Sequence, residues 1–266
     1  MNWQSRRLLH QASAYLALLV FTSLILAPFL WLLTSTVRPV TELYIYPPRW
    51  IPEHFTLAAY GRALQSFDMP LANSAFYGLI TSLLTLITAC PAAYSLTRLR
   101  YPGKRFVTAL LLITQMLPFV LLLLPLYIIY LRLNLYNTRL GLIIGFTALT
   151  IPYATLLLRS FFASLPEELE DQAMVDGCTR LKALWYVVLP LSKPVLVAVV
   201  LSSMVLVWND VLFTIFLSKD IEIQTASVAL YRLFTLRSAS GGMAQKEVML
   251  ASGVLLTLPV IALFTF

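Results

Sequence analysis

The residues of this sequence whose types and spacing could do chemistry lie together in one polar stretch between long apolar runs. The stretch, PEELEDQAMVDGCTRLKALWYVVLPLSKP, occupies residues 166–194 and holds five of the chain's twelve acidic residues in its first eleven positions. The sequence contains no Ser-His-Asp or Cys-His arrangement and no G-x-x-x-x-G-K-[ST] phosphate loop. The chemistry to expect here is therefore recognition of another molecule rather than catalysis.

Local signals in this stretch predict two short helices joined by a sharp turn. Ser164 followed by Glu167 has the spacing of a capping box, and Pro166 suits a first helical turn, where its missing N–H costs nothing. Gly177 is expected to end the first helix in left-handed geometry. Thr179 can cap the second helix. A segment with two caps and a turn residue in register is expected to be rigid.

The predicted second helix carries an apolar stripe along one face, which is expected to pack against the rest of the protein. The stripe has the i, i+3, i+4, i+7 and i+8 spacing of an amphipathic helix. Its members are Leu181, Leu184, Trp185, Val188 and Leu189.

The predicted first helix begins with negative charge, which favours the positive end of a helix dipole. Its surface is expected to face solvent and to engage a soluble partner, with apolar side chains set among the charges. The alternative is a membrane-surface loop whose charges are simply solvated. The candidate contact residues are Glu167, Glu168, Leu169, Glu170, Asp171, Ala173, Met174, Asp176 and Gly177.

The elements that must position this stretch are apolar. Of the 266 residues, 59% are hydrophobic and 12% are charged, against about 25% charged in a soluble domain. We therefore expect an all-α membrane protein that forms a single domain over residues 1–266. Six runs reach the roughly 20 residues that a membrane helix needs. They cover residues 9–35, 71–97, 106–131, 139–163, 190–217 and 248–266.

Basic residues near the ends of these runs predict the orientation in the membrane. The net charge is +7, but the basic residues flank apolar runs, which favours a role in topology over nucleic-acid binding. The short loop 98–105 holds four basic residues and no acid. We expect this loop, residues 166–194 and both termini to be cytoplasmic. The first run, at about 25 residues, is too long for the apolar core of a signal peptide and is read as a retained helix.

Few polar residues interrupt the predicted spans. Asp210 is the only acid well within one, and a charge at mid-span costs on the order of 2.5–3.5 kcal/mol, so it should face the bundle interior or a water-filled path. Two interpretations stay open: it lines or gates a route for solute, or it makes a buried hydrogen bond between helices. The other candidates for such a route are Trp208, Asn209, Asn73 and Gln115.

The remaining residues that could bind a metal or form a disulfide are isolated in the sequence. Cys90 falls in an apolar run and Cys178 in the polar stretch, so both are interpreted as structural and unpaired. His10 and His54 are far apart and have no ligand set beside them in the sequence. We expect no metal site and no cofactor bound by this chain.

Several segments resemble the permeases of bacterial ABC importers, in particular the carbohydrate-uptake permeases related to the maltose-transporter subunit pair. In the cytoplasmic EAA loop of that family, an acid and two alanines precede Asp-Gly and a helix that ends in Leu-Pro-Leu. This chain has Asp171, Gln172 and Ala173 at the first three positions, so Asp171 and Gln172 depart from the pattern. The matching positions are Asp176, Gly177, Leu189, Pro190, Leu191 and Pro194; further likeness lies in NSAFYGL (73–79), AAYSLTRLRYPGKR (92–105), LPLYIIYLRLNLYNTRLGLI (124–143) and WND (208–210).

The resemblance covers about residues 70–260 and implies a fold, partners and a location. The expected fold is a MetI-like ABC importer permease with six transmembrane helices and a cytoplasmic coupling loop over 164–189. The implied partners are a second permease subunit in a heterodimer, two cytoplasmic ATPases that carry ATP and Mg, and a sugar-binding protein docked outside on residues 36–70 and 218–247. The chain would lie in the bacterial inner membrane and would not itself be an enzyme.

Other functions remain open. Within the same architecture the cargo could be glycerol phosphate or another small solute instead of a di- or oligosaccharide. An ATP-independent carrier is the alternative from another class, and a membrane enzyme lacks any clustered catalytic set in the sequence. Similar permeases usually continue into a short cytoplasmic tail, whereas this sequence ends at Phe266.

Overall fold

The computed structural model describes residues 3–238 and 243–265, and over these residues the chain is helical, with no strand. The chain divides into two compact units: Met1–Phe67 with Arg232–Pro259, and Asp68–Tyr231 with Val260–Phe266. The second unit contains the polar stretch and the predicted solute route. The all-α membrane fold expected from the sequence is confirmed. Residues 239–242, which belong to the predicted docking loop 218–247, lie outside the described residues.

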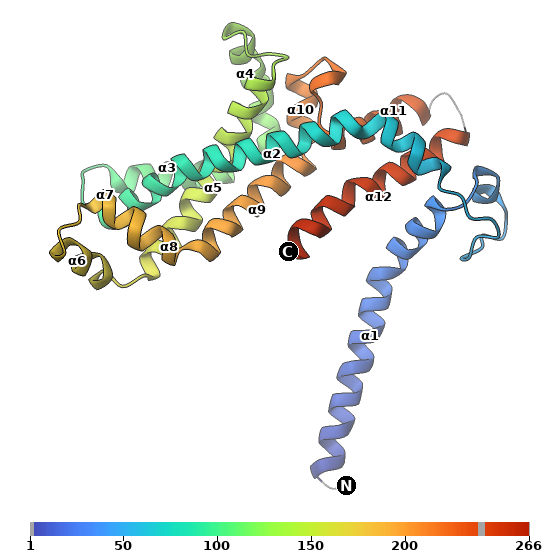
Figure 1. The fold of residues 1–266 in the computed structure, drawn as a ribbon, viewed down its shortest axis with the longest axis horizontal. Helices are drawn as coiled ribbons and strands as arrows, with labels where there is room; N and C mark the ends of the chain where they lie inside the picture. The colour runs from blue at the N-terminus through green and yellow to red at the C-terminus, as the bar shows by residue number, and fades with distance from the viewer. Residues whose placement is uncertain (1–2, 239–242, 266) are drawn as a thin grey trace. The chain divides into compact units, whose positions relative to one another are not determined.

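Four helices form the body of the second unit. They are the later part of α2 (Ala58–Arg98), α3 (Lys104–Met116), α5 (Arg139–Ser164) and α9 (Lys193–Asn209). α5 lies between α3 and α9 and packs against both (Figure 1). Apolar residues all along these helices give them the composition of spans. α2 starts well before the predicted run, because residues 58–70 continue the helix through Pro70.

Two predicted spans are broken rather than continuous. α3 is followed by α4 (Phe119–Arg132) at an angle of 104°, and α9 by α10 (Leu212–Leu217). At the first break Leu117 is extended (φ −73°, ψ 128°), as expected for a residue before proline. At the second break Asp210 is extended (φ −71°, ψ 134°) and its carboxylate binds the first turn of α10. Each of the predicted segments 106–131 and 190–217 is therefore built from more than one helix in the structure.

Two apolar clusters hold the second unit together. One joins Tyr94 of α2 to Leu158 and Phe162 of α5 and to Val199 of α9, all at most 5% exposed. The other lies further along the same helices and contains Tyr77, Phe146, Val207 and Phe213. α5 contributes to both clusters. At Gly145 this helix leaves no room for a side chain, since an added Cβ would meet the Phe213 ring and the Tyr130 hydroxyl.

The first unit contains α1 (Trp3–Thr36), the short η1 (Val40–Tyr44), the start of α2 and most of α12 (Met243–Thr265). Arg38 is 2% exposed and donates to the carbonyls of Thr34, Arg49 and Trp50, which fixes the turn after α1. Ala59 and Ala63 of α2 pack against Val248 and Ala251 of α12. The side chains of residues 11–26 of α1 are exposed in the single chain.

The helices meet the requirements of length and composition for a membrane protein. Four of the described helices are long and apolar enough to cross a membrane, and there are up to six spans if each bent pair is counted as one. The second bent pair joins Arg180–Leu191 to α9 at 79°. The α11 helix (Ala226–Ser238) and the short η3 (Ile221–Ile223) complete the chain between α10 and α12.

Candidate functional site: the loop between α5 and α9

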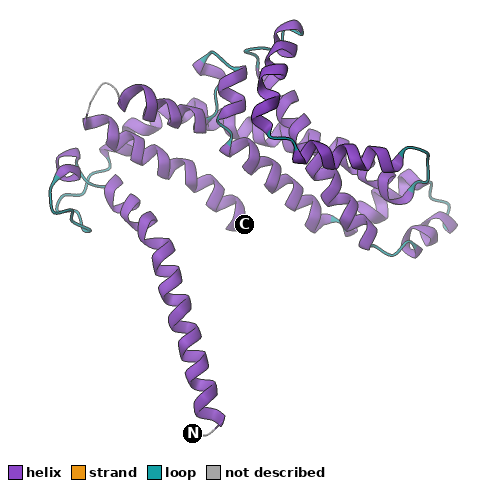
Figure 2. Cartoon of the chain, turned by 180° about the vertical axis from the view of Figure 1, so that it is seen from behind, coloured by secondary structure: helices purple, strands orange, loops and turns teal. Residues whose placement is uncertain are grey.

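The polar stretch folds into two helical pieces at one end of the second unit, beyond the ends of α2 and α5 (Figures 1 and 2). The first piece is α6 (Glu168–Val175). The second is a continuous rod made of α7 (Arg180–Ala183), the π-helical turn η2 (Leu184–Val188) and α8 (Leu189–Leu191). The helix–turn–helix arrangement expected over 164–189 is what the structure shows.

The turn between the two pieces is a Schellman motif. Gly177 has φ +89°, its N–H donates to Met174 O at 3.1 Å, and the N–H of Cys178 donates to Ala173 O at 3.0 Å. Thr179 then caps α7, because its hydroxyl accepts from the N–H of Lys182 at 3.4 Å. The roles predicted for Gly177 and Thr179 are confirmed. This turn fixes the direction of the rod relative to α6.

The predicted capping box at the start of the loop is wrong. Ser164 is the last residue of α5, and its hydroxyl donates to Phe161 O of its own helix at 2.7 Å. Glu167 precedes α6 with helical dihedral angles and makes no side-chain cap bond. Because α5 runs on through Ser164, this hydroxyl is used by α5 and is not available to α6. Glu168, Glu170 and Asp171 still place negative charge in the first turn of α6.

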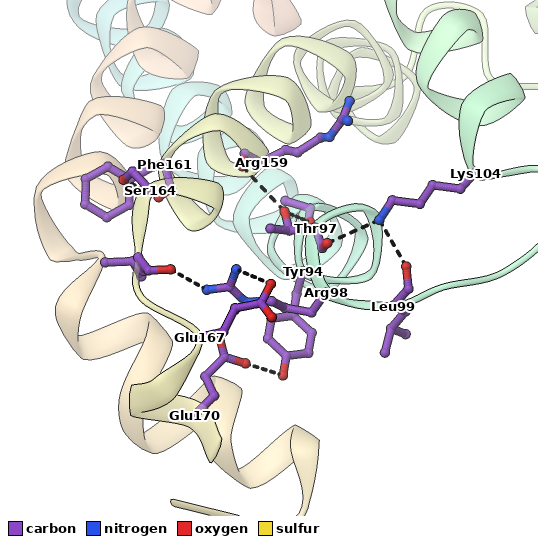
Figure 3. Close-up of polar contacts among 12 residues, drawn as sticks. Tyr94, Thr97, Arg98, Leu99, Lys104, Arg159, Phe161, Ser164, Glu167 and Glu170 are labelled. Carbon is purple, nitrogen blue, oxygen red and sulfur yellow. Dashed lines mark hydrogen bonds and ion pairs between the residues drawn. The ribbon is translucent and has the colours of Figure 1, made fainter. Parts of the chain in front are cut away.

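A buried ion pair ties α6 to the end of α2 (Figure 3). Arg98 Nε donates to Glu170 Oε1 at 2.6 Å, and these side chains are 6% and 8% exposed. The Tyr94 hydroxyl donates to Glu170 Oε2 at 2.7 Å, and Arg98 Nη2 donates to Leu165 O at 2.8 Å. Both oxygens of Glu170 are thus bonded to α2. Without these partners, burial of the Glu170 carboxylate would cost several kcal/mol of folding free energy, on the order of the penalty for an unpaired buried charge.

The end of α2 is held in place by hydrogen bonds. Lys104 Nζ donates to the carbonyls of Thr97 and Leu99 at 3.2 and 3.0 Å, which satisfies acceptors that the helix end leaves open. The Thr97 hydroxyl bonds Ala93 O and reaches Arg159 O of α5 at 3.4 Å. The short basic turn 98–105, used above for orientation, therefore also holds Arg98 in place (Figure 3).

The candidate contact residues of α6 divide into an outer and an inner set. Glu170 faces inward and is 6% exposed, so it is not part of the solvent-facing surface. Val175, which no sequence pattern marks as a contact residue, is 87% exposed. Ala173 and Met174 are half-buried, and the exposed set is Glu167, Glu168, Leu169, Asp171, Asp176 and Gly177. The outer surface of α6 is therefore acidic with two apolar side chains, Leu169 and Val175.

The predicted apolar stripe of the second helix is right for three of its five residues and wrong for two. Leu184 and Val188 are buried in the cluster that joins α2, α5 and α9, and Leu189 packs against it. Leu181 and Trp185, by contrast, are 67% and 66% exposed. The π-helical turn explains the difference, because its wider i→i+5 spacing changes which residues share a face. Ala183 takes the inward position instead.

Three of the five residues proposed for a solute route lie around one hollow. Gln115, Asn209 and Asp210 line an open space of about 460 Å³ at the level where α3 and α9 end. Asp210 Oδ2 accepts from the N–H and hydroxyl of Thr214, both at 2.9 Å, and Oδ1 accepts from Phe213 N at 3.2 Å. Its carboxylate thus closes the first turn of α10, while Asn209 and Gln115 are exposed.

The other two route candidates lie elsewhere. Trp208 is 7% exposed in the interior, and its carbonyl accepts from the Ser227 hydroxyl. Asn73 is 5% exposed and donates to the carbonyls of Glu222 and Gln224, at 2.7 and 3.1 Å. In the structure Asn73 holds the segment around η3 against α2.

One expectation about metal ligands needs correction. His54 has only Glu53 beside it in the sequence, yet its Nδ1 lies 2.8 Å from Glu42 Oε1, and ligand atoms of Glu42, Glu53 and His54 lie within 4.8 Å of one another. Folding of the 37–57 segment brings them together. The Glu42 carboxylate already accepts from the backbone N–H groups of Glu53 and His54, so the cluster is explained as a turn.

These features define a class of protein: a helical membrane protein with a rigid, acidic helix protruding from one end. The family model of the binding-protein-dependent transport system inner membrane component matches residues 83–266. The chain belongs to this family and is a membrane component of a transport system in the inner membrane. The resemblance stated from the sequence is confirmed.

Relatives and solved structures agree with that assignment. The sulfoquinovosyl glycerol transport system permease protein SmoH of Agrobacterium fabrum is 35% identical over 77% of this chain and 73% of its own length. The trehalose transport system permease protein SugB of Mycobacterium tuberculosis is 32% identical over 77% of this chain and 75% of its own. A bacterial ABC transporter involved in the import of the acidic polysaccharide alginate shares the fold, with TM-score 0.85 and 24% identity over 100% of this chain and 97% of that one.

Proposed function

We propose that this chain is the permease subunit of an ATP-driven importer of carbohydrate, and that α6 is the element on which a cytoplasmic ATPase acts. The observation that carries the proposal is the construction of α6. Its outer surface is exposed, its C-terminal end is fixed by the Gly177 turn, and its inner side is tied to α2 through Glu170. A helix held in this way can transmit a push without bending.

The contacts supply two routes for such a push. One passes through the Glu170–Arg98 pair to the end of α2. The other passes through the turn at Gly177 to the rod, whose Leu184 and Val188 pack against α5 and α9. The routes end on α2 and α5, which are long enough to cross a membrane, and on α9. Movement of α6 would therefore tilt several membrane helices together, as alternating access requires.

The proposal includes partners. A second permease subunit would complete the translocation path, and two ATPase subunits would carry ATP and Mg and perform the hydrolysis. This chain is then non-catalytic, with its N-terminus and α6 in the cytoplasm. A substrate-loaded binding protein would dock on the opposite side, on residues 36–70 and 218–247, since the family depends on such a protein.

Carbohydrate is the proposed cargo class because of the relatives. The permeases of sulfoquinovosyl glycerol and trehalose transport are both at least 32% identical to this chain. The hollow lined by Gln115, Asn209 and Asp210 is proposed as part of the route, since its amide and carboxylate groups are of the kind that bind hydroxyls. A thermal-shift screen of the cognate binding protein against a panel of sugars would identify the particular sugar.

The docking role is tested by reversing charge on the outer surface of α6. The double variant Glu168→Lys/Asp171→Lys is compared with Glu222→Lys, which changes an exposed acid of η3 in the same unit. The α6 variant is expected to lose association with the ATPase subunits in pull-down, together with stimulated hydrolysis and uptake. The control is expected to retain ATPase association. Equal association of both variants with the ATPase would remove the docking role.

A further inference from the structure

The rod formed by Arg180–Leu191 leaves the span α9 at 79°, with only Ser192 between them. α9 begins with Lys193 and has no other charged residue in its 17 residues, which at about 1.5 Å each cover about 25 Å of the roughly 30 Å hydrocarbon layer. Its start must therefore lie close to one face of the membrane. A helix that departs there at 79° runs along the membrane surface, even if α9 tilts by about 20°.

The rod has one face packed against this chain and one face that is exposed with respect to the described residues of the chain. Ala183, Leu184 and Val188 are buried, whereas Trp185 and Tyr186 are 66% and 74% exposed. Two large aromatic side chains side by side on a rod at the membrane surface have the placement of an interfacial belt, where the rings settle at headgroup level.

The charge around the rod has a single sign. From Cys178 to Asn209 the sequence has three basic residues and no acid. Arg180 lies beside the acids of α6, in the hollow that Glu170 and Asp171 also line. Lys182 and Lys193 bracket the aromatic pair, are exposed, and form no ion pair within the described part of the chain. This surface complements an anionic leaflet.

The α6 helix differs from the rod in the sign of its charge. α6 is acidic on its outer surface, and the rod is basic and aromatic on its own. The opposite charges of these two helices, which are joined by one rigid turn, suit two different contacts. The acidic helix suits the ATPase, and the basic rod suits lipid.

We propose that the rod Arg180–Leu191 lies in the headgroup layer of the cytoplasmic leaflet, where Trp185 and Tyr186 insert and Lys182 and Lys193 bind anionic phospholipid. The proposal rests on the proposed function in one point, the cytoplasmic position of this loop. Lipid then anchors the rod at the membrane surface. Because the rod is anchored, a push on α6 rotates the membrane helices instead of lifting the loop from the bilayer.

The insertion is tested with Trp185 itself. The assembled transporter is placed in nanodiscs whose phosphatidylcholine carries bromine on the acyl chain near the headgroup, and tryptophan fluorescence is compared with that in unbrominated lipid. The wild type is expected to lose more fluorescence than Trp185→Phe. The double variant Trp185→Phe/Tyr186→Trp, which moves the indole by one residue, is expected to restore the loss. Equal quenching of the wild type and Trp185→Phe overturns the proposal. Quenching by aqueous acrylamide is also compared with and without the ATPase subunits. If Trp185 is shielded from acrylamide only when the ATPase subunits are bound, the ATPase covers it instead of lipid, and the proposal is overturned.

The charge contacts are tested with spin-labelled phosphatidylglycerol and phosphatidylcholine. Lys182→Gln/Lys193→Gln is expected to lower the preference for phosphatidylglycerol on the order of tenfold at low salt, since each surface cation favours an anionic lipid. Lys219→Gln, an exposed lysine next to η3, is the matched control and is expected to leave the preference unchanged. An unchanged preference in the double variant overturns the lipid contact. ATP-driven uptake is measured in parallel, so a failed lipid contact with intact uptake is separable from failure of the transporter assignment.

Discussion

Single charges decide how α6 is held. Glu170 is enclosed, and both of its oxygens are bonded to α2 through Arg98 and Tyr94. An ion pair of this kind adds little net stability compared with an apolar pair, but removal of one partner leaves the other charge buried and unpaired. The pair therefore specifies position: α6 has one place where Glu170 is satisfied.

Replacement of Arg98 by Gln is expected to destabilise the loop by about 3–5 kcal/mol, because the buried carboxyl group of Glu170 loses its closest hydrogen-bond partner. ATP hydrolysis by the assembled transporter should then lose its dependence on the binding protein, and uptake should fall. Arg100→Gln is the control, since Arg100 lies in the same turn but is exposed. Restoration of coupling in Arg98→Glu/Glu170→Arg would show that the pair itself matters. Full coupling in Arg98→Gln would show that α2 receives no force from Glu170.

The two residues beside the hollow separate a structural role from a transport role. Asp210→Ala removes three bonds to α10 and is expected to lower stability by about 1–2 kcal/mol, as loss of a helix cap does, and uptake with it. Asn209 is exposed on the hollow, so Asn209→Ala should weaken uptake while thermal stability stays unchanged. Uptake and thermal unfolding are measured at matched membrane abundance. Unaltered uptake in Asn209→Ala would exclude the hollow from the route.

Local sequence signals predicted the turn and the second cap correctly but failed for the capping box at Ser164, whose hydroxyl is used by α5. Gly177 and Thr179 are recognised from their types and spacing, because a left-handed turn and a helix cap each need only a few neighbouring residues. The Arg98–Glu170 pair joins positions 72 residues apart, and nothing in the spacing announces it. From the sequence, Arg98 indicates only the orientation in the membrane, and Glu170 only a contact with a partner.

At the scale of elements, the turn between α6 and the rod can be tested with a matched pair of glycines. Gly177 and Gly103 have φ +89° and +86°, and an added Cβ would meet nothing within 4 Å at either position. Alanine at each therefore carries the same backbone strain of about 1–2 kcal/mol. Gly177→Ala is expected to impair ATPase association and uptake, whereas Gly103→Ala is expected to leave ATPase association intact. Equal effects on pull-down and uptake would mean that strain alone, and not the angle between α6 and the rod, is responsible.

The elements themselves were predictable in existence but not in continuity. Apolar runs of about 20 residues located the spans, because hydropathy depends on composition alone. The breaks at Leu117 and Asp210 depend on how freed backbone groups are satisfied by other helices, which a run of apolar letters does not reveal. The π-helical turn at Leu184–Val188 likewise rotated a stripe that an α-helical period places elsewhere.

At the scale of the whole molecule, many large apolar side chains are exposed in the single chain. The exposed apolar side chains of α1 suit a lipid environment, and the proposed function assigns the exposed surface of α6 to a soluble partner. Family membership followed from the sequence because the loop motif is specific. The sequence shows that α6 and the rod carry opposite charges. The structure adds that a rigid turn at Gly177 separates the two helices.

The natural cysteines provide a test of how the chain is oriented. Cys178 lies in the turn between α6 and the rod and is partly exposed, whereas Cys90 is 7% exposed within the cluster of α2, α5 and α9. A membrane-impermeant maleimide is therefore expected to label the protein in inside-out vesicles and not in intact right-side-out cells, and Cys178→Ser should abolish the labelling. Bound ATPase subunits should slow the reaction at Cys178, because the turn lies next to the proposed docking helix. Labelling from outside intact cells would place α6 on the wrong side of the membrane for an ATP-driven motor, and the coupling assignment would fail with it.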